Sequence, residues 1–451
     1  MIPKHDSHSR PLFVALPRER AENRRIRRNM EIKEMAIPAV GQTSRVVTKC
    51  QICGSNDLKS KLFLGSLPSV NIMHPIGAQV SEEVAYPAEL LHCGMCGLAQ
   101  LSVVVDARIL FPSEYPYTSS TTKILRENFA ELYTECRSLV KLAAQDLIID
   151  IGSNDGNLLS NFKTGHRVLG ITPEAIGNIA IERGIPTLIS YFDRPAVDKV
   201  LKEQGKAKVV TATNVFAHID DVGEVLKGIT SLLEDDGVFI SESHYLIPLV
   251  ETLQYDTIYH EHLRYYSLES LRFLLEGHGL EIFHAKRIPT HGGSIRVYAA
   301  RPGKYPVQAS VAKVTADERE LALGDKAFDD FRRRVVESKL ELMGILRDVK
   351  RKGARVFGVS APSRASTLIN YVGIDDGILD CVVEVEGSHK IGKYVPGTRI
   401  PIVAEKALFE KQPEYALLLS WHIADELIPK LKAKGFKGRF IMPLPTPRVV
   451  D

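Results

Sequence analysis

Between residues 147 and about 300, short apolar runs alternate with segments of helical period. Residues 147–151 are four apolar residues and one Asp, which is typical of a strand buried on both faces of a parallel sheet. Further strands are expected at 167–172, 207–213 and 237–242. Because helical segments separate the strands, the pattern predicts an α/β domain with helices on both faces of a parallel sheet.

The pattern on either side predicts further domains. Residues 308–353 contain no Pro and carry apolar side chains at helical spacing, which predicts one long amphipathic helix between domains. From residue 354 a strand, a turn of small residues and a helix start follow, so a second Rossmann-like α/β domain is expected at 350–451. Residues 1–45 are rich in Arg and lack a sustained apolar period, which predicts a disordered basic tail.

Composition agrees with a multidomain globular protein. A chain of 451 residues is too long for one core, and 44% hydrophobic with 25% charged residues is the globular average. A net charge of +3 gives no reason to expect nucleic acid as the partner of the whole chain. No apolar run reaches membrane-spanning length and the first residues lack a signal-peptide core. A cytoplasmic protein without a membrane partner is therefore expected.

Four of the six cysteines form two Cys-x-x-Cys pairs, each followed directly by Gly. Without a secretory signal, such pairs indicate a metal site rather than disulfides. Four thiolates suit tetrahedral zinc and leave no open coordination position, so the zinc would be structural. The alternative is four reduced cysteines in a core. The predicted zinc ligands are Cys50, Cys53, Cys93 and Cys96.

A tight turn follows the strand at 147–151, with glycines at positions 152 and 156. Glycine lets backbone pass close to a ligand, and the next helix offers free N–H groups. The spacing is neither the dinucleotide fingerprint nor the phosphate loop, and the carboxylates in it suit a cofactor without phosphates. A merely sharp turn is the alternative. The stretch resembles motif I of class I S-adenosylmethionine methyltransferases, and its candidate cofactor-binding residues are Asp150, Gly152, Asn154, Asp155 and Gly156.

Two later strand ends add to this candidate site. In such sheets a carboxylate about 20 residues past the glycines usually binds the ribose hydroxyls. The matching position here is Thr172, and Glu174 is a possible substitute. Asn214 and His218 follow the strand at 207–213, where ligands of parallel sheets bind, although a lone His at a strand end can equally be structural.

Ionisable and phenolic side chains are most concentrated at residues 255–267, where Tyr259, His260, Glu261 and His262 are consecutive. The zinc-protease motif His-Glu-x-x-His is absent. An imidazole titrates near ~6.5, so it can accept a proton at neutral pH while a neighbouring group fixes its tautomer. We therefore predict a general base here, with Tyr259 and His262 on one face and Glu261 behind; a buried polar network is the alternative.

Three loops, together with the turn of small residues that ends at Ser363, offer candidate substrate contacts. The Tyr- and Pro-rich segment at 111–120 could cover an active site or be a packed linker, and the basic Gly-containing loop at 388–399 suits phosphates or is simply solvated. Paired glycines at 292–293 suggest backbone close to substrate. The candidate substrate-binding residues are Tyr115, Tyr117, Ser120, His291, Gly292, Gly293, Ser363, Lys390 and Lys393.

The order of these motifs resembles the three-domain sugar-nucleotide C-methyltransferases that methylate carbon 3 of 4-keto-deoxysugars, over residues 46–445. The resemblance implies a zinc domain at 46–105, a methyltransferase domain at 106–307, a linking helix at 308–349 and a nucleotide-binding-like domain at 350–451. In that family the positions of His218, Tyr259, Glu261 and His262 line the active site, the last as base. Two departures are Thr172, where the family usually has an acidic residue, and residues 362–365, where it usually reads Ala-Lys-Gly-Asn.

The resemblance implies S-adenosylmethionine as cofactor, a structural zinc and a small nucleotide-linked sugar as substrate, with the protein a monomer or homodimer. His262 would remove a proton beside the ketone, with Glu261 or Tyr259 orienting it, and Tyr259 or His218 would donate to the enolate oxygen. Two other classes stay open. One is a keto-sugar-nucleotide epimerase or NAD-linked enzyme on the same fold, and the other is a nucleic-acid-binding zinc module with a basic arm.

Overall fold

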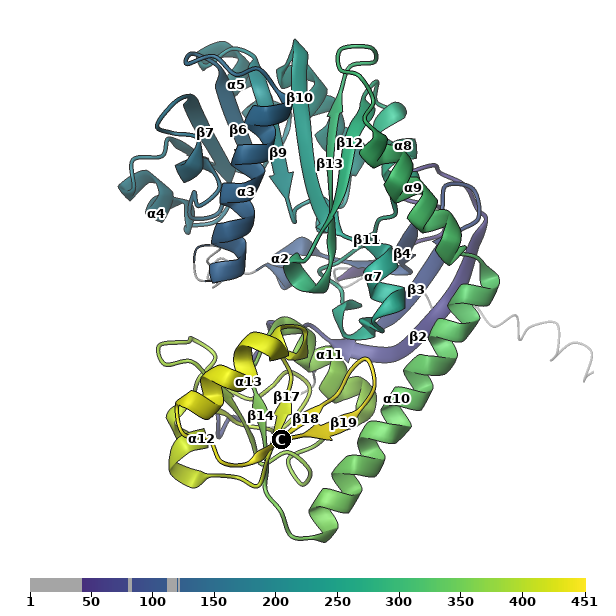
Figure 1. Ribbon diagram of the computed structural model, residues 1–451, viewed down its shortest axis with the longest axis vertical. Helices are drawn as coiled ribbons and strands as arrows, with labels where there is room; N and C mark the ends of the chain where they lie inside the picture. The colour runs from purple at the N-terminus through teal and green to yellow at the C-terminus, as the bar shows by residue number, and fades with distance from the viewer. Residues whose placement is uncertain (1–42, 80–82, 112–119, 121) are drawn as a thin grey trace, which may run out of the picture. The chain divides into compact units, whose positions relative to one another are not determined.

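The computed structural model describes residues 43–79, 83–111, 120 and 122–451 (Figure 1). Almost all of the predicted tail at 1–45 lies outside the described residues, and so do Tyr115 and Tyr117. Three large sheets and one two-stranded sheet are formed within residues 44–451. No helix among the described residues is long and apolar enough to cross a membrane.

The largest sheet has seven strands in the order β12-β13-β10-β9-β6-β7-β8. Its strands β6 to β10 are parallel, and β12 and β13 complete one edge in antiparallel pairing. The strands are β6 (Leu147–Ile151), β7 (Arg167–Thr172), β8 (Thr187–Ile189), β9 (Ala207–Thr213), β10 (Leu233–His244), β12 (Glu281–Ile288) and β13 (Ser294–Ala300). All five residues of β6 are buried, which explains its nearly continuous apolar sequence.

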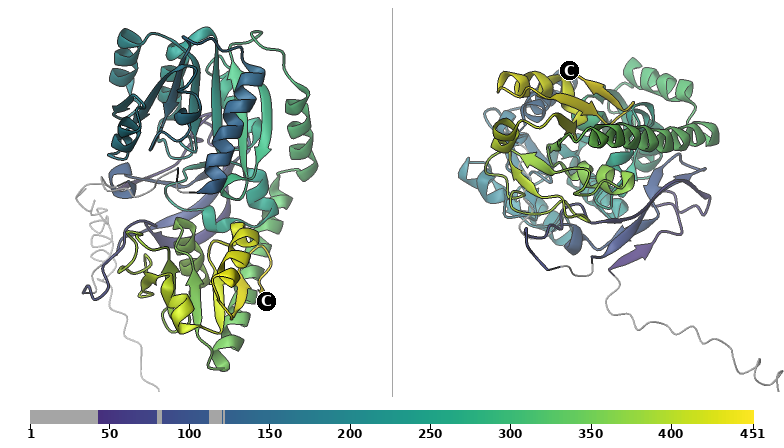
Figure 2. Two further views of the ribbon diagram at one scale, coloured as in Figure 1. Left: turned by 60° about the vertical axis from the view of Figure 1, so that its left-hand side comes forward. Right: turned by 90° about the horizontal axis from the view of Figure 1, so that it is seen from below.

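Helices cover this sheet, as the alternating pattern predicts. Figures 1 and 2 show α3 lying along the sheet, where Phe129 and Leu132 pack with Ile148 and Val209. The helices of this region are α3 (Lys123–Leu139), α4 (Gly177–Glu182), α5 (Arg194–Glu203), α6 (Val222–Leu232), α7 (Leu246–Glu251) and α8 (Leu268–Glu276).

The N-terminal sheet has the order β11-β4-β3-β2, and a separate pair joins β1 to β5. The elements are β1 (Ser44–Val46), β2 (Leu58–Pro68), β3 (Ala85–Cys93), β4 (Ala99–Leu101), β5 (Val103–Val105), the short helix α2 (Ala107–Leu110) and β11 (Arg264–Tyr265). Strand β11 comes from the middle of the chain and pairs with β4 through Arg264 with Gln100 and Tyr265 with Ala99. The cysteine-bearing sheet therefore includes the segment that directly follows the predicted catalytic cluster.

The C-terminal sheet has six strands in the order β16-β15-β14-β17-β18-β19, all parallel except for β19. Its first strand and helix occur where the sequence predicts a second α/β domain. The elements are β14 (Val356–Val359), α11 (Ser363–Val372), β15 (Cys381–Glu384), β16 (Ile402–Ala404), α12 (Lys406–Lys411), β17 (Tyr415–Leu418), α13 (Ala424–Ala433), β18 (Arg439–Met442) and β19 (Arg448–Val450).

Two helices occupy the segment predicted as one. The structure has α9 (Ala309–Leu321) and α10 (Asp325–Arg351), separated where Ala322 adopts a left-handed conformation with φ of 46° before Gly324. Helix α10 contacts β2, beside which it runs in Figure 1. Its buried Phe328 and Phe331 belong to a core shared with strands of the N-terminal and C-terminal sheets.

Candidate active site

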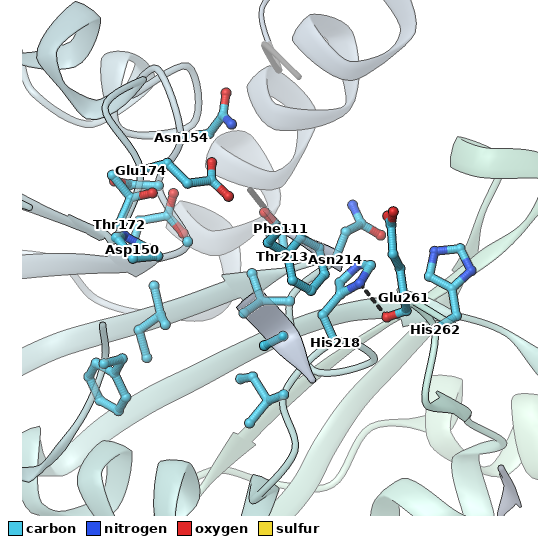
Figure 3. A pocket seen from close by; sticks show the side chains of 18 of the residues that line it. Phe111, Asp150, Asn154, Thr172, Glu174, Thr213, Asn214, His218, Glu261 and His262 are labelled. Atoms are coloured by element: carbon cyan, nitrogen blue, oxygen red, sulfur yellow. Dashed lines mark hydrogen bonds between the residues drawn. The ribbon is translucent and has the colours of Figure 1, made fainter. Parts of the chain in front are cut away.

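A cavity of about 1170 Å³ lies at the carboxyl ends of the parallel strands. Ligands of open α/β sheets bind at this edge, so the position alone marks the cavity as a candidate site. Its walls come from β6, β7, β9 and β10, from the segment that contains the predicted base, and from the C-terminal sheet region. Figure 3 shows two groups of side chains, one near Asp150 and one near His262, with Phe111, Thr213 and Asn214 between them.

The first group gathers Asp150, Asn154, Thr172 and Glu174 (Figure 3). The turn that follows β6 needs its glycine, because Gly152 has φ of 72° and a Cβ there would lie 2.4 Å from Val215 Cγ2. Asn154 also adopts a left-handed conformation, with φ of 50°, which asparagine tolerates better than most residues. The turn therefore holds a tight path at the edge of the cavity.

Burial raises the pKa of both carboxyl side chains in this group. Asp150 accepts a hydrogen bond from Thr211 Oγ1 at 2.6 Å, but desolvation dominates and raises its pKa to about 7. Burial also raises the pKa of Glu174, and no hydrogen-bond partner for its carboxylate occurs in the described part of the chain. Thr172 is buried at the end of β7. Of the two residues considered for the ribose, Glu174 is thus the one with a carboxylate available to a ligand.

Asp155 and Gly156 lie behind the turn and do not line the cavity. Asp155 is fully buried and pairs with Arg183 at 2.9 Å, and its carboxylate also accepts the backbone N–H of Ser120 at 3.3 Å. A Cβ at Gly156 would lie 2.6 Å from Ile185 Cδ1. These contacts give both residues a role in fixing the turn, and Ser120 meets the turn rather than the cavity.

The second group is centred on His262, whose ring centroid lies 4.2 Å from that of Tyr259 and 5.0 Å from that of His218. His262 Nδ1 is 2.8 Å from the carbonyl oxygen of Thr257. A carbonyl only accepts, so Nδ1 carries the proton and Nε2 keeps its lone pair. Burial first, and then the nearby His218, lower the pKa of His262 well below 6.5, so the ring is neutral at pH 7.

The side chain of His218 binds the backbone of Glu261, since His218 Nδ1 donates a hydrogen bond to the Glu261 carbonyl oxygen at 2.6 Å (Figure 3). Burial lowers the pKa of His218 to about 4. The Glu261 carboxylate accepts a hydrogen bond from Asn71, which follows β2. Tyr259, Glu261, His262 and His218 all line the cavity, as the sequence predicts for a single site.

Several residues that were not predicted from the sequence line the same end, among them His244, Arg364 and His422. His244 ends β10 and its ring centroid lies 4.2 Å from that of His262. The rule that ligands meet the ends of parallel strands could have identified it. Arg364 and His422 come from the C-terminal sheet region, and no local sequence pattern connects them to this cavity.

The predicted substrate loops divide into two sets. His291, Ser363 and Lys390 line the cavity, whereas Gly292, Gly293 and Lys393 do not. Lys390 donates from Nζ to the Ala361 carbonyl at 2.7 Å, and burial lowers its pKa. Gly292 and Gly293 have φ of 88° and 131°, and Cβ atoms there would meet Gln254 and Pro248. They therefore shape the turn that carries His291.

The four predicted zinc ligands come together, with all four sulfurs within 4.8 Å of one another. Cys50 and Cys96 sulfurs are 3.5 Å apart, and those of Cys53 and Cys93 are 3.6 Å apart. Zn–S bonds of about 2.3 Å place tetrahedral sulfurs roughly 3.8 Å apart, so this donor set fits zinc. Cys93 ends β3 and Cys96 precedes β4, which places the site at one end of the N-terminal sheet.

Matches to known families divide the chain into three parts, each of which contains most strands of one of the three large sheets. Three family models match: "Putative zinc binding domain" at residues 50–111, "Methyltransferase domain" at 125–285, and "C-methyltransferase C-terminal domain" at 289–445. The C-methyltransferase NovU of Streptomyces niveus is 32% identical over 414 residues, which are 90% of this chain and 98% of NovU. The chain belongs to the C-methyltransferase family. It is an S-adenosylmethionine-dependent C-methyltransferase, which confirms the resemblance drawn from the motifs.

Solved methyltransferase structures resemble the chain over a smaller part. Magnesium protoporphyrin IX methyltransferase from Synechocystis PCC 6803, with bound SAH, is 15% identical and covers 39% of this chain and 83% of its own, with a TM-score of 0.32. The CcbJ methyltransferase from Streptomyces caelestis is 14% identical and covers 42% of this chain and 93% of its own, also with a TM-score of 0.32.

The group of residues around Asp150 fits this cofactor. Glu174 offers a half-buried carboxylate without a partner in the described chain, which suits ribose hydroxyls. Asn214 Oδ1 is buried and lacks a hydrogen-bond partner among the described residues, and it lines the cavity between the two groups. A buried acceptor left unsatisfied costs free energy that a cationic cofactor would recover. The imidazoles of His218 and His262 are neutral, so they do not repel the positive charge of a sulfonium.

Proposed function

We propose that this C-methyltransferase acts on a nucleotide-linked 4-keto-deoxysugar, through an enolate formed by His262. The observation that carries the proposal is the tautomer of His262. Its Nδ1 is held by the Thr257 carbonyl, so the basic lone pair is on Nε2 of a neutral ring that lines the cofactor cavity. The resemblance of the motifs to keto-sugar C-methyltransferases supplies the substrate class.

The chemistry requires a base because carbon becomes nucleophilic only after it loses a proton. Beside a ketone this loss is feasible, since the C–H electron pair moves into a C=C bond and the carbonyl pair moves onto oxygen. The proton goes to His262 Nε2, and a positioned base of this kind accelerates the step roughly 10²–10⁴-fold. S-adenosylmethionine supplies a methyl group on a sulfonium that is already activated for transfer.

The thiolate site supplies no chemistry to this reaction. The four cysteine sulfurs would fill the coordination sphere of a tetrahedral zinc, so no position would remain for a substrate oxygen. Cys50, Cys53, Cys93 and Cys96 thus hold the N-terminal sheet together.

The C-terminal side of the cavity would bind the rest of the substrate. Ser363 lies at the start of α11 and Lys390 in the basic loop, and both line the cavity. The Lys390 ammonium and the free N–H groups at the start of α11 suit a diphosphate. The same residues would also serve an enzyme that only deprotonates a keto sugar, but the family match favours methyl transfer over epimerisation or NAD-linked chemistry.

The test is methyl transfer to dTDP- and GDP-linked 4-keto-6-deoxyhexoses in the presence of S-adenosylmethionine. We expect a product one CH₂ heavier than the substrate and an equal amount of S-adenosylhomocysteine, measured by mass spectrometry. His262→Asn should lower the rate roughly 10²–10⁴-fold, as expected for loss of a general base. His278→Asn, on a histidine that does not line the cavity, is the matched control. Methylation of another carbon acid but of no keto sugar would refute the substrate class.

A further inference from the structure

The ring of His244 faces the predicted base across a short gap. Its centroid is 4.2 Å from that of His262 and 5.7 Å from that of His291, and its side chain lines the cavity. His244 is the last residue of β10, a strand held on both sides by β9 and β13. The backbone of His244 is in register with Ser294 of β13, whereas the pairing with β9 ends at Glu242. This position at the end of a central strand suits a residue that must be held in place relative to the base.

The two nitrogens of His244 have different surroundings. Nδ1 is buried and has no hydrogen-bond partner among the described residues. Nε2 also has no hydrogen-bond partner among the described residues but is not fully buried, so it is the nitrogen that a ligand in the cavity can reach. A buried N–H without an acceptor is rarer than a buried acceptor without a donor. The tautomer with its proton on Nε2 is therefore favoured, and His244 presents an N–H donor to the cavity.

The ring of His244 is neutral, because burial and the neighbouring His262, His291, His218 and Arg364 all lower its pKa well below 6.5. A neutral imidazole carries a single N–H proton, so each ring offers the cavity either an N–H donor or a bare acceptor nitrogen. His262 presents a bare nitrogen, and His244 presents an N–H. An acceptor and a donor on adjacent rings match the two groups of a ketone that change during deprotonation, the α C–H and the carbonyl oxygen.

We propose that His244 is a catalytic residue whose Nε2–H donates to the carbonyl oxygen of the substrate as it becomes an enolate oxygen. The inference rests on the proposed enolate chemistry and adds a donor to it. Electron flow is balanced within the substrate: the C–H pair forms the C=C bond, the carbonyl pair moves to oxygen, and the proton goes to His262. His244 keeps its proton and stabilises the negative charge. A neutral imidazole is a suitable donor because it does not protonate the enolate outright.

The experiment measures enolate formation apart from methyl transfer. The enzyme is incubated in D₂O with dTDP-4-keto-6-deoxyglucose and S-adenosylhomocysteine, which has no methyl group to give, and deuterium entering the α position is followed by proton NMR. His244→Phe keeps an aromatic ring and removes the donor, so we expect exchange to slow roughly 10²–10³-fold, as for loss of one oxyanion donor. His244→Gln keeps a neutral N–H at similar reach and should restore most of the rate.

The controls separate this role from folding and binding. His278→Phe should exchange at the wild-type rate, and calorimetric binding of the keto sugar should be unchanged in His244→Phe. If that variant does not fold, His244→Met removes the same donor on a flexible side chain. Wild-type exchange in His244→Phe, or a His244→Gln variant as slow as it, overturns the inference. If the wild-type enzyme itself neither exchanges nor methylates any keto sugar, the proposed function fails instead.

Discussion

At the scale of single residues, burial sets the protonation states in the cavity. The pKa of His262 lies well below 6.5, and burial brings those of His218 and His291 to about 4. A base must be unprotonated, so activity should be present above the folded pKa of His262 and lost as pH falls through it. We expect kcat/KM to keep its full value at pH 6.5 and to decline below it. A decline centred at or above pH 6.5 would contradict the assignment.

The same shifts affect stability, which must be measured alongside the kinetics. An unfolded imidazole titrates near ~6.5, whereas the folded His218 titrates at about 4, so between these values the unfolded state binds more protons. Stability should therefore fall as pH falls from 6.5 toward 4. Circular dichroism at each pH identifies the range in which loss of rate reflects His262 rather than unfolding.

Glu174 provides a second prediction for a single residue. If its carboxylate binds the ribose hydroxyls, Glu174→Gln removes a charge-assisted hydrogen bond of about 1.5–3 kcal/mol and should weaken S-adenosylmethionine binding roughly 10–150-fold. Calorimetric titration measures this change. Glu182→Gln, on an exposed residue of the nearby α4, is the matched control and should bind normally. Equal affinities of the two variants would show that Thr172 or another group binds the ribose.

Residues were predictable where the chemistry is local in sequence. Sequence spacing alone identifies three features: the paired cysteines, the turn between Gly152 and Gly156, and the cluster at 259–262. Thr257 could not be found this way, because it acts through its carbonyl, which every residue has. Arg364 and His422 reach the cavity only through the folding of distant segments.

At the scale of elements, β11 links the thiolate site to the predicted base. It follows His262 by two residues and pairs with β4, which lies three residues after Cys96. Removing zinc should disorder this sheet edge and with it the segment that holds His262. We expect Cys53→Ser, or treatment with a strong chelator, to abolish methyl transfer although zinc touches no substrate.

Cofactor binding distinguishes this effect from general unfolding. The residues around Asp150 come from β6 and β7, which do not pair with the zinc-bearing sheet. S-adenosylmethionine should therefore still bind the zinc-depleted protein in calorimetry, and re-addition of zinc should restore turnover. Full turnover after verified loss of zinc would refute the link through β11.

Element boundaries were predictable only in part. The alternating strands were evident because the apolar runs are short and regularly spaced. The break between α9 and α10 was not, since residues 308–353 contain no Pro and the chain turns through Ala322, a good helix former, in a left-handed conformation. Strand β11 was also missed, because two residues carry too little periodicity to identify a strand.

At the scale of the whole molecule, a buried ion pair joins the C-terminal sheet region to the segment of the predicted base. Arg364 donates twice to Asp256, at 2.8 and 2.7 Å, and Trp421 Nε1 donates to the same carboxylate at 2.8 Å. The guanidinium also lies 4.9 Å from the centre of the Trp421 ring. Asp256 directly precedes Thr257, whose carbonyl orients His262, so this contact between distant segments supports the geometry of the base.

Breaking this pair should therefore lower both stability and turnover. Arg364→Met leaves Asp256 buried and unpaired, which costs about 3–5 kcal/mol. Arg364→Lys keeps the charge but loses the two-pronged bond and the stacking on Trp421, so it should recover little. The exposed pair of Arg347 with Asp348 gives the control, because Arg347→Met removes a solvent-screened contact and should leave stability nearly unchanged. Differential scanning calorimetry compares the variants.

The kinetic consequence distinguishes a structural contact from one that serves the base. In the double variant Asp256→Asn with Arg364→Met no charge remains buried, so stability should recover relative to Arg364→Met alone. Turnover should stay low, because both hydrogen bonds from the Arg364 guanidinium to the residue before Thr257 are then lost. Deuterium exchange in the presence of S-adenosylhomocysteine reports this directly. Recovery of both stability and exchange in the double variant would mean that the pair only fills space, and that the Thr257 carbonyl holds His262 without help from the C-terminal region.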